Sequence, residues 1–135
     1  MQKIFKKLEE RAKNIIKYSV CDEEKFFRCV HFSFILRRNK ILVESFNIKK
    51  TDSSAIDMGY PFGYLHSEAG CIKRLLKNSS IDPKDCKLVN LRLARASGGL
   101  LLAAPCPKCL RLIFRTGIRT TYFSINSSSY GKVLL

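Results

Sequence analysis

Two short clusters of residues that commonly bind metal ions restrict how this chain can fold. His66-Ser67-Glu68 opens one predicted helix, and Pro105-Cys106-Pro107-Lys108-Cys109 opens another, with a predicted strand between the two helices. If side chains from both clusters bind one ion, the starts of the two helices must meet in space. This requirement favours an α/β fold that brings both helix starts together.

The spacing of apolar residues predicts three helices and about five strands. The helices are predicted at residues 2–18, 66–77 and 106–116, and the strands at 29–36, 41–48, 87–96, 118–125 and 132–135, with Leu100 to Ala104 as a strand-length piece before Pro105. A polar turn at 37–40 makes the first two strands a hairpin. The first helix should lie on the sheet through its apolar stripe, Phe5, Leu8, Ala12 and Ile15.

Inward-facing residues are also predicted for the other two helices. In the helix at 66–77 these are Ala69, Ile72, Leu75 and Leu76. In the helix at 106–116 they are Leu110, Ile113 and Phe114, and Gly117 is expected to end this helix.

The short C-terminal segment decides the direction of the last strand. Only ten residues follow the strand predicted at 118–125, and a parallel crossover with its helix needs roughly ten to twelve. A strand at 132–135 must therefore return antiparallel. The expected fold class is a three-layer α/β domain with a mixed sheet and helices on both faces. No repeat or low-complexity linker divides the chain, so residues 1–135 are predicted to form one domain.

The ligand types indicate a reactive zinc site. His66, Cys106 and Cys109 would supply one imidazole and two thiolates, a soft three-ligand set for Zn²⁺ that leaves a fourth position for water. The positive end of each helix dipole would help to keep the cysteines as thiolates. Glu68 lies two residues past His66, too close to share the ion comfortably, and is placed to move protons instead.

The remaining cysteines are expected to be small, buried apolar residues: Cys21, Cys29, Cys71 and Cys86. Six cysteines in a chain without a secretory signal argue against a disulfide framework. A redox role for the Cys106–Cys109 pair is the alternative. Against it, a thioredoxin-like pair should follow the first strand of a βαβ unit, whereas this pair lies late in the chain.

The paired motifs resemble those of the cytidine deaminase superfamily, whose signature is H-x-E followed by P-C-x-x-C. The matching residues are His66, Glu68, Pro105, Cys106 and Cys109. The order of the predicted elements matches too, so the likeness covers the chain from about Cys29 onward. Many members have Ala in the middle of the triplet, where this chain has Ser67. The resemblance implies a cytidine deaminase-like fold and hydrolytic deamination of cytosine, with Zn²⁺ as the cofactor and Glu68 as the catalytic residue.

The resemblance also points to residues that contact the substrate. Family members carry an Asn at the end of the second strand that contacts the base or sugar, and Asn47 falls there; an Asn that caps a turn is the alternative. Thr51 is expected near a phosphate or sugar, and an ordinary polar loop residue is the alternative. Aromatic rings in the loop before His66 could stack on a base or pack the loop onto the core. These rings belong to Tyr60, Phe62 and Tyr64, and Ser67 and Pro105 complete the predicted substrate-binding set.

The charge favours polyanionic partners, and a basic protein that is merely soluble in a salty or crowded host is the alternative. The chain has 25 basic and 11 acidic residues, a net charge of +14, and residues 86–135 contain eight basic side chains and no carboxylate. Lys108, Arg111 and Arg115 share one face of the last predicted helix, with Arg119 just beyond, and could follow a phosphate backbone. A solvated basic face is the alternative for each of them.

Three functions follow from these observations. The first is deamination of cytosine in single-stranded DNA or RNA, which the charge and the aromatic loop favour. The second is a deaminase of free cytidine or deoxycytidylate, usually an oligomer whose subunits close the pocket, and the compact length fits this equally well. The third is a nucleic-acid-binding module with a structural zinc, which the intact Glu68 argues against. Adenine stays an alternative target base.

The N-terminus bears on location. It interleaves charged and apolar residues and lacks the apolar core of a secretory signal. No apolar run reaches the roughly 18 to 20 residues that span a bilayer. The sequence therefore predicts a cytoplasmic protein that makes no membrane contact.

Overall fold

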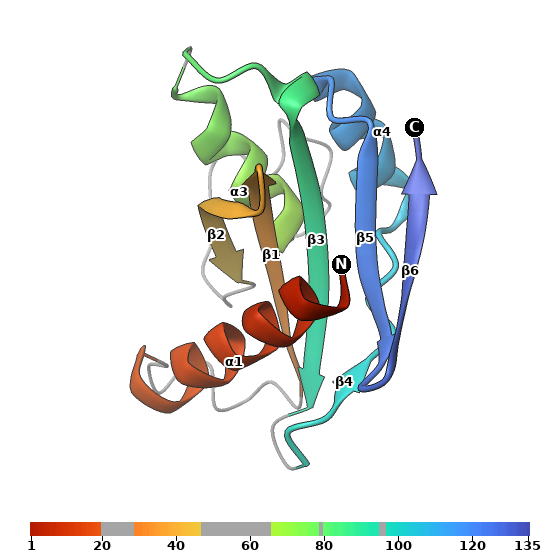
Figure 1. Ribbon diagram of the computed structural model, residues 1–135. Helices are drawn as coiled ribbons and strands as arrows, with labels where there is room; N and C mark the ends of the chain where they lie inside the picture. The colour runs from red at the N-terminus through yellow and green to blue at the C-terminus, as the bar shows by residue number, and fades with distance from the viewer. Residues whose placement is uncertain (20–28, 47–65, 79, 95–96) are drawn as a thin grey trace.

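A mixed sheet with helices on both faces forms the body of the molecule in the computed structural model, which describes residues 1–19, 29–46, 66–78, 80–94 and 97–135 (Figure 1). Within these residues the helices are α1 (Gln2–Ser19), α3 (Ser67–Leu76) and α4 (Pro107–Thr116), with a short 3₁₀ helix, η2 (Pro83–Asp85). The strands are β1 (Cys29–Arg37), β2 (Lys40–Phe46), β3 (Cys86–Ala94), β4 (Leu100–Leu101), β5 (Thr120–Asn126) and β6 (Ser129–Leu134).

The sheet combines antiparallel and parallel pairs. Its strand order is β2-β1-β3-β5-β6, and the two-residue β4 pairs with the end of β3. β1 is antiparallel to both β2 and β3, whereas β3 and β5 are parallel. β6 returns antiparallel to β5, which confirms the direction predicted from the short C-terminal segment.

The predicted hairpin is also confirmed. Arg37 pairs with Lys40, and the two residues between them, Arg38 and Asn39, have φ angles of 51° and 64°. Two left-handed residues in succession make the tight turn whose twist matches the twist of the flanking strands.

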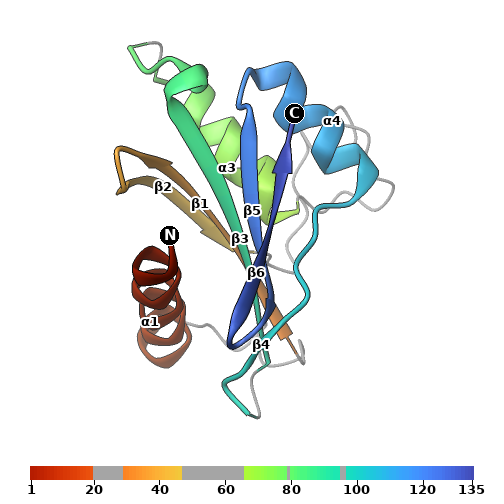
Figure 2. The ribbon, with the colours of Figure 1, turned by 45° about the vertical axis from the view of Figure 1, so that its right-hand side comes forward.

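α1 covers one face of the sheet, and α3 and α4 cover the other (Figure 2). The predicted stripe of α1 is buried against alternate residues of β1 and β3, because successive side chains of a strand point to opposite faces. This core contains Phe5, Leu8, Ala12, Ile15, Val30, Phe32, Phe34, Leu36, Val89, Leu91 and Leu93.

The opposite face of β1 and β3 changes from apolar to polar along its length. Ile35 and Leu88 lie opposite each other and are buried with side chains of α3 and α4. The next pair on the same face is Ser33 and Asn90, and the pair after that is His31 and Arg92. The polar stretch is where α3 and α4 begin, so this change positions the site described below.

Two predicted core residues are exposed. Leu76 is 60% exposed and Phe114 is 53% exposed, so the predictions that they face inward were wrong. Each directly follows a buried residue, Leu75 or Ile113. One step along an α-helix turns the side chain by about 100°, which takes it off the stripe that faces the sheet.

None of the described helices, α1, α3 and α4, has the length and apolar character needed to cross a bilayer.

Candidate metal centre

His66 and Cys106 are the N-cap residues of α3 and α4. Both have extended backbone angles, and their carbonyl oxygens accept the first helical hydrogen bonds, from the N–H groups of Gly70 (3.0 Å) and Leu110 (2.9 Å). Neither side chain caps its own helix. Pro107, in the first turn of α4, has the fixed φ angle that suits a helix start. The imidazole and the thiol are therefore left to take part in contacts between the helices.

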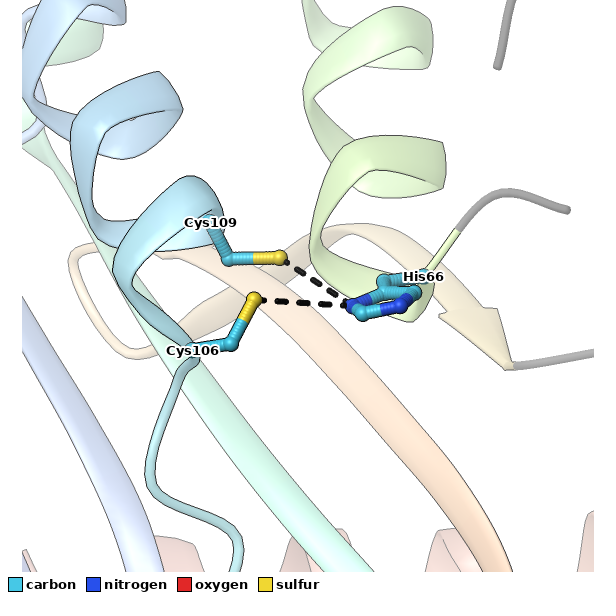
Figure 3. A group of neighbouring side chains, drawn as sticks. All are labelled: His66, Cys106 and Cys109. Atoms are coloured by element: carbon cyan, nitrogen blue, oxygen red, sulfur yellow. Dashed lines mark hydrogen bonds between the residues drawn. The ribbon is translucent and has the colours of Figure 1, made fainter. Parts of the chain in front are cut away.

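The three predicted ligands lie together in space (Figure 3). His66 Nδ1 is 3.7 Å from Cys106 Sγ and 3.5 Å from Cys109 Sγ. The ligand atoms of all three residues lie within 4.8 Å of one another. The predicted meeting of the two helix starts is thus confirmed.

These distances suit zinc. With usual Zn–N and Zn–S bond lengths and tetrahedral angles, a nitrogen and a sulfur bound to the same ion lie about 3.5 Å apart. Cys109 is fully buried, Cys106 is half-buried and His66 is exposed. Within the described residues, no fourth His, Cys, Asp or Glu joins this group. The three side chains could hold one zinc ion with a position left for water, the arrangement of catalytic zinc sites.

Glu68 is the buried acid beside these ligands. Its carboxylate accepts a hydrogen bond from the hydroxyl of Ser67, with Ser67 Oγ and Glu68 Oε1 3.0 Å apart, and only 7% of the residue is exposed. Both residues line a cavity of about 260 Å³, near the lower end of the range for small-ligand pockets. The described lining is His31, Phe32, His66, Ser67, Glu68, Asn90, Ala103, Ala104 and Cys106.

A buried thiol ties α3 to β1 behind this cavity. Cys71 Sγ donates to the carbonyl oxygen of Ser33 at 3.0 Å, and burial raises the pKa of the Cys71 thiol well above its usual range. Cys71 and Cys86 are buried, as predicted, whereas Cys29 is half-buried. Cys21 lies outside the described residues.

The remaining predicted site residues fall into two groups. Pro105 is buried directly before Cys106. Lys108, Arg111, Arg115 and Arg119 are exposed on or just after α4 and do not belong to the described cavity lining. The predicted substrate contacts Asn47, Thr51, Tyr60, Phe62 and Tyr64 lie outside the described residues.

Several cavity residues were not predicted from the sequence. His31, Phe32 and Asn90 come from β1 and β3, and Ala103 and Ala104 from the segment before α4. Asn90 carried a usable signal, because it is a polar residue in the alternating pattern of a buried strand. Its hydrogen bonds explain its burial, as described below.

His31 predicts a pH dependence of stability. Burial, followed by the nearby positive charge of Arg92, lowers the pKa of His31 from its usual value of 6.5. Below about pH 6.5 the unfolded chain therefore binds more protons at this position than the folded chain. The stability that neutral His31 provides is fully present above about pH 6.5. It is lost as the pH falls towards the lower pKa that His31 has in the folded protein.

The test compares the wild-type protein with a His31→Gln variant. Urea unfolding of both proteins in saturating zinc, at intervals from about pH 7.5 to about pH 5, should show a smaller loss of unfolding free energy in the variant. Parallel curves for the two proteins would show that His31 does not contribute.

The comparisons with known proteins show the fold. No family model matches the sequence, and no curated protein matches it. In structure, the chain is similar to the dCMP deaminase from the cyanophage S-TIM5 in apo form, with a TM-score of 0.58 and 19% sequence identity. The similarity covers 91% of this chain and 83% of that chain. The chain therefore has the cytidine deaminase-like fold that its two motifs predicted.

Proposed function

We propose that this chain is a zinc-dependent enzyme that deaminates cytosine to uracil in a free nucleotide or nucleoside. The observation that carries this proposal is the convergence of His66, Cys106 and Cys109 at two helix starts, with the Glu68 carboxylate buried beside them. A protein that needs only a structural zinc has no use for an open coordination position or for a buried acid at its side. The fold shared with a dCMP deaminase supports the same reaction.

Each residue has a role in the proposed reaction. His66, Cys106 and Cys109 hold the ion, and zinc bound there supplies the Lewis acidity that makes water a nucleophile at neutral pH. Glu68 takes a proton from the attacking water and delivers it to the amine that leaves the ring. The cavity walls, which include Phe32 and Ala104, would lie around the base.

Two observations favour a small substrate. The structurally similar cyanophage enzyme is named for a free nucleotide, dCMP. The basic side chains that could follow a polynucleotide are exposed on or just after α4 and do not line the cavity. Deamination of cytosine in single-stranded DNA or RNA, which the charge of the sequence favours, is therefore the second candidate. It is favoured by the exposure of Lys108, Arg111 and Arg115.

A substrate panel separates the two candidates. The zinc-loaded protein is incubated with cytidine, dCMP, dCTP, a cytosine-containing single-stranded DNA and the matching RNA, and uracil formation is measured. Conversion of one or more of the monomers, with the polymers left intact, is the expected result. Conversion of the polymers alone, at a rate that falls steeply with added salt, would instead support the polynucleotide substrate. Adenosine and dAMP are incubated in parallel, and their deamination without any uracil formation from the cytosine substrates would contradict cytosine as the target base.

A further inference from the structure

A line of buried polar side chains leads from the middle of the sheet to Glu68. Asn90 Oδ1 on β3 lies 2.7 Å from Ser33 Oγ on β1. The hydroxyls of Ser33 and Ser67 are 2.8 Å apart, and that of Ser67 is 3.0 Å from Glu68 Oε1. None of the four residues is more than 7% exposed. The sheet interior is thereby connected to the proposed proton-transfer group.

These polar groups replace what could have been apolar packing. The neighbouring pair on the same face, Ile35 and Leu88, fills the space under the helices with hydrocarbon. Burying hydroxyl and amide groups instead is unfavourable unless each one has a hydrogen-bond partner. The two hydroxyls and the amide of this line have one another as hydrogen-bond partners, and the last partner in the line is the Glu68 carboxylate.

The number of protons limits how the line can be bonded. Three contacts join the four side chains, but Ser33 and Ser67 carry one hydroxyl proton each. If Asn90 presents its oxygen to Ser33 and the Glu68 carboxylate accepts from Ser67, the contact between the two serines has no proton. A 2.8 Å contact between two oxygens without a proton is unfavourable.

Turning the Asn90 amide by 180° supplies the missing proton. The oxygen and nitrogen of an amide side chain are alike in shape, so either orientation fits the same space. The turn gives up the contact from Asn90 Nδ2 to the carbonyl oxygen of Ala103, which at 3.5 Å is at the outer limit of a hydrogen bond. In exchange, each of the three contacts in the line then has one donor and one acceptor.

We propose that Asn90, Ser33 and Ser67 form a one-way relay of hydrogen bonds that positions the Glu68 carboxylate. Asn90 Nδ2 donates to Ser33 Oγ, Ser33 donates to Ser67 Oγ, and Ser67 donates to Glu68 Oε1. The final bond is made to a charged acceptor, which strengthens it and aligns the others. The three residues are positioning residues, and their effect on turnover rests on the proposed function.

Turnover measurements test the positioning role. Ser67→Ala is expected to lower kcat about tenfold, because the carboxylate loses its fixed partner, and Ser33→Ala about threefold. KM and zinc content should stay unchanged. The double variant should resemble Ser67→Ala alone, because residues in series act as one unit. A double variant whose kcat falls about thirtyfold, the product of the two single losses, would overturn the proposal. So would a Ser67→Ala protein with normal kcat.

A matched control separates positioning from stability. Ser124 on β5 is also a fully buried hydroxyl, but it donates to the carbonyl oxygen of Leu101 (2.7 Å) and does not line the described cavity. Ser124→Ala should lower the melting temperature and leave kcat unchanged. A loss of kcat as large as that of Ser67→Ala would indicate a general effect of removing buried hydroxyls, and would overturn the proposal.

The connection between Asn90 and Ser67 can be tested without activity. In the zinc-loaded protein, the side-chain amide protons of Asn90 are followed by NMR in the wild type and in the Ser67→Ala and Ser124→Ala variants. A relay predicts that Ser67→Ala shifts these signals and Ser124→Ala does not. Asn90 amide signals that do not shift in the Ser67→Ala variant would overturn the relay, even if the enzyme is active. A shift in a protein inactive on the whole substrate panel would leave the relay standing and remove the proposed function.

Discussion

A Glu68→Gln protein is expected to bind one zinc ion per chain and to deaminate cytosine about 10²- to 10⁴-fold more slowly than the wild type. Glutamine keeps the shape of the side chain and can still contact Ser67, so the cavity should remain intact. It cannot take a proton from water and pass it on. Uracil formation measures the reaction, and metal analysis of the purified variant measures the zinc.

An acid at the surface provides the control for this variant. Glu44 on β2 is paired with Arg11 on α1, through Arg11 Nη2 at 2.5 Å and Nε at 3.0 Å, and is not part of the described cavity lining. Glu44→Gln should leave turnover unchanged. Full activity of Glu68→Gln with zinc bound would remove the proton-transfer role. Loss of the ion from Glu68→Gln would instead indicate that Glu68 is a ligand.

A Cys109→Ala protein is expected to lose both the metal and the activity. Cys109 is fully buried between the helix starts, so water cannot easily replace its sulfur as a ligand. Two remaining ligands, one of them on an exposed histidine, hold zinc far more weakly than three. The expected zinc content after dialysis is close to zero, with activity below detection.

A second buried cysteine serves as the control for metal loss. Cys86 is 3% exposed and belongs to the core formed with Ile113 and Ile118. Cys86→Ala should lose some stability and keep both zinc and activity. A Cys109→Ala protein that kept its zinc would exclude Cys109 as a ligand and would revive the redox interpretation of the Cys106–Cys109 pair.

The sequence predicted the fold well because its strongest signals are local. The amphipathic stripe of α1 and the alternation along β1 and β3 each lie within one element, and the ten residues left after the predicted strand at 118–125 excluded a parallel return. The errors at Leu76 and Phe114 have a local cause too. Each lies one step past a buried residue, Leu75 or Ile113, at a position that its helix does not turn towards the sheet.

The three predicted zinc ligands and Glu68 could be predicted to lie together because motif spacing and helix starts are visible in the sequence. The Ser33–Ser67–Asn90 contacts could not be predicted, because they depend on the register between β1 and β3 and on how α3 lies across them. A lone serine in a strand pattern carries no sign of its partner. Ser33 is 34 positions from Ser67 and 57 positions from Asn90 in the sequence, so these side chains meet only once the sheet is assembled.

The change of character along one side of β1 and β3 has a consequence for how this protein can vary. The even-numbered residues from Val30 to Leu36 belong to the core under α1. The odd-numbered residues between them change from apolar Ile35, through Ser33, to His31 at the polar cavity. Tolerance to substitution along β1 should therefore alternate with a period of two. Substitution at Val30, Phe34 or Leu36 should mainly change resistance to heat, whereas substitution at Phe32, which belongs to the core under α1 and also lines the cavity, should change both stability and the site.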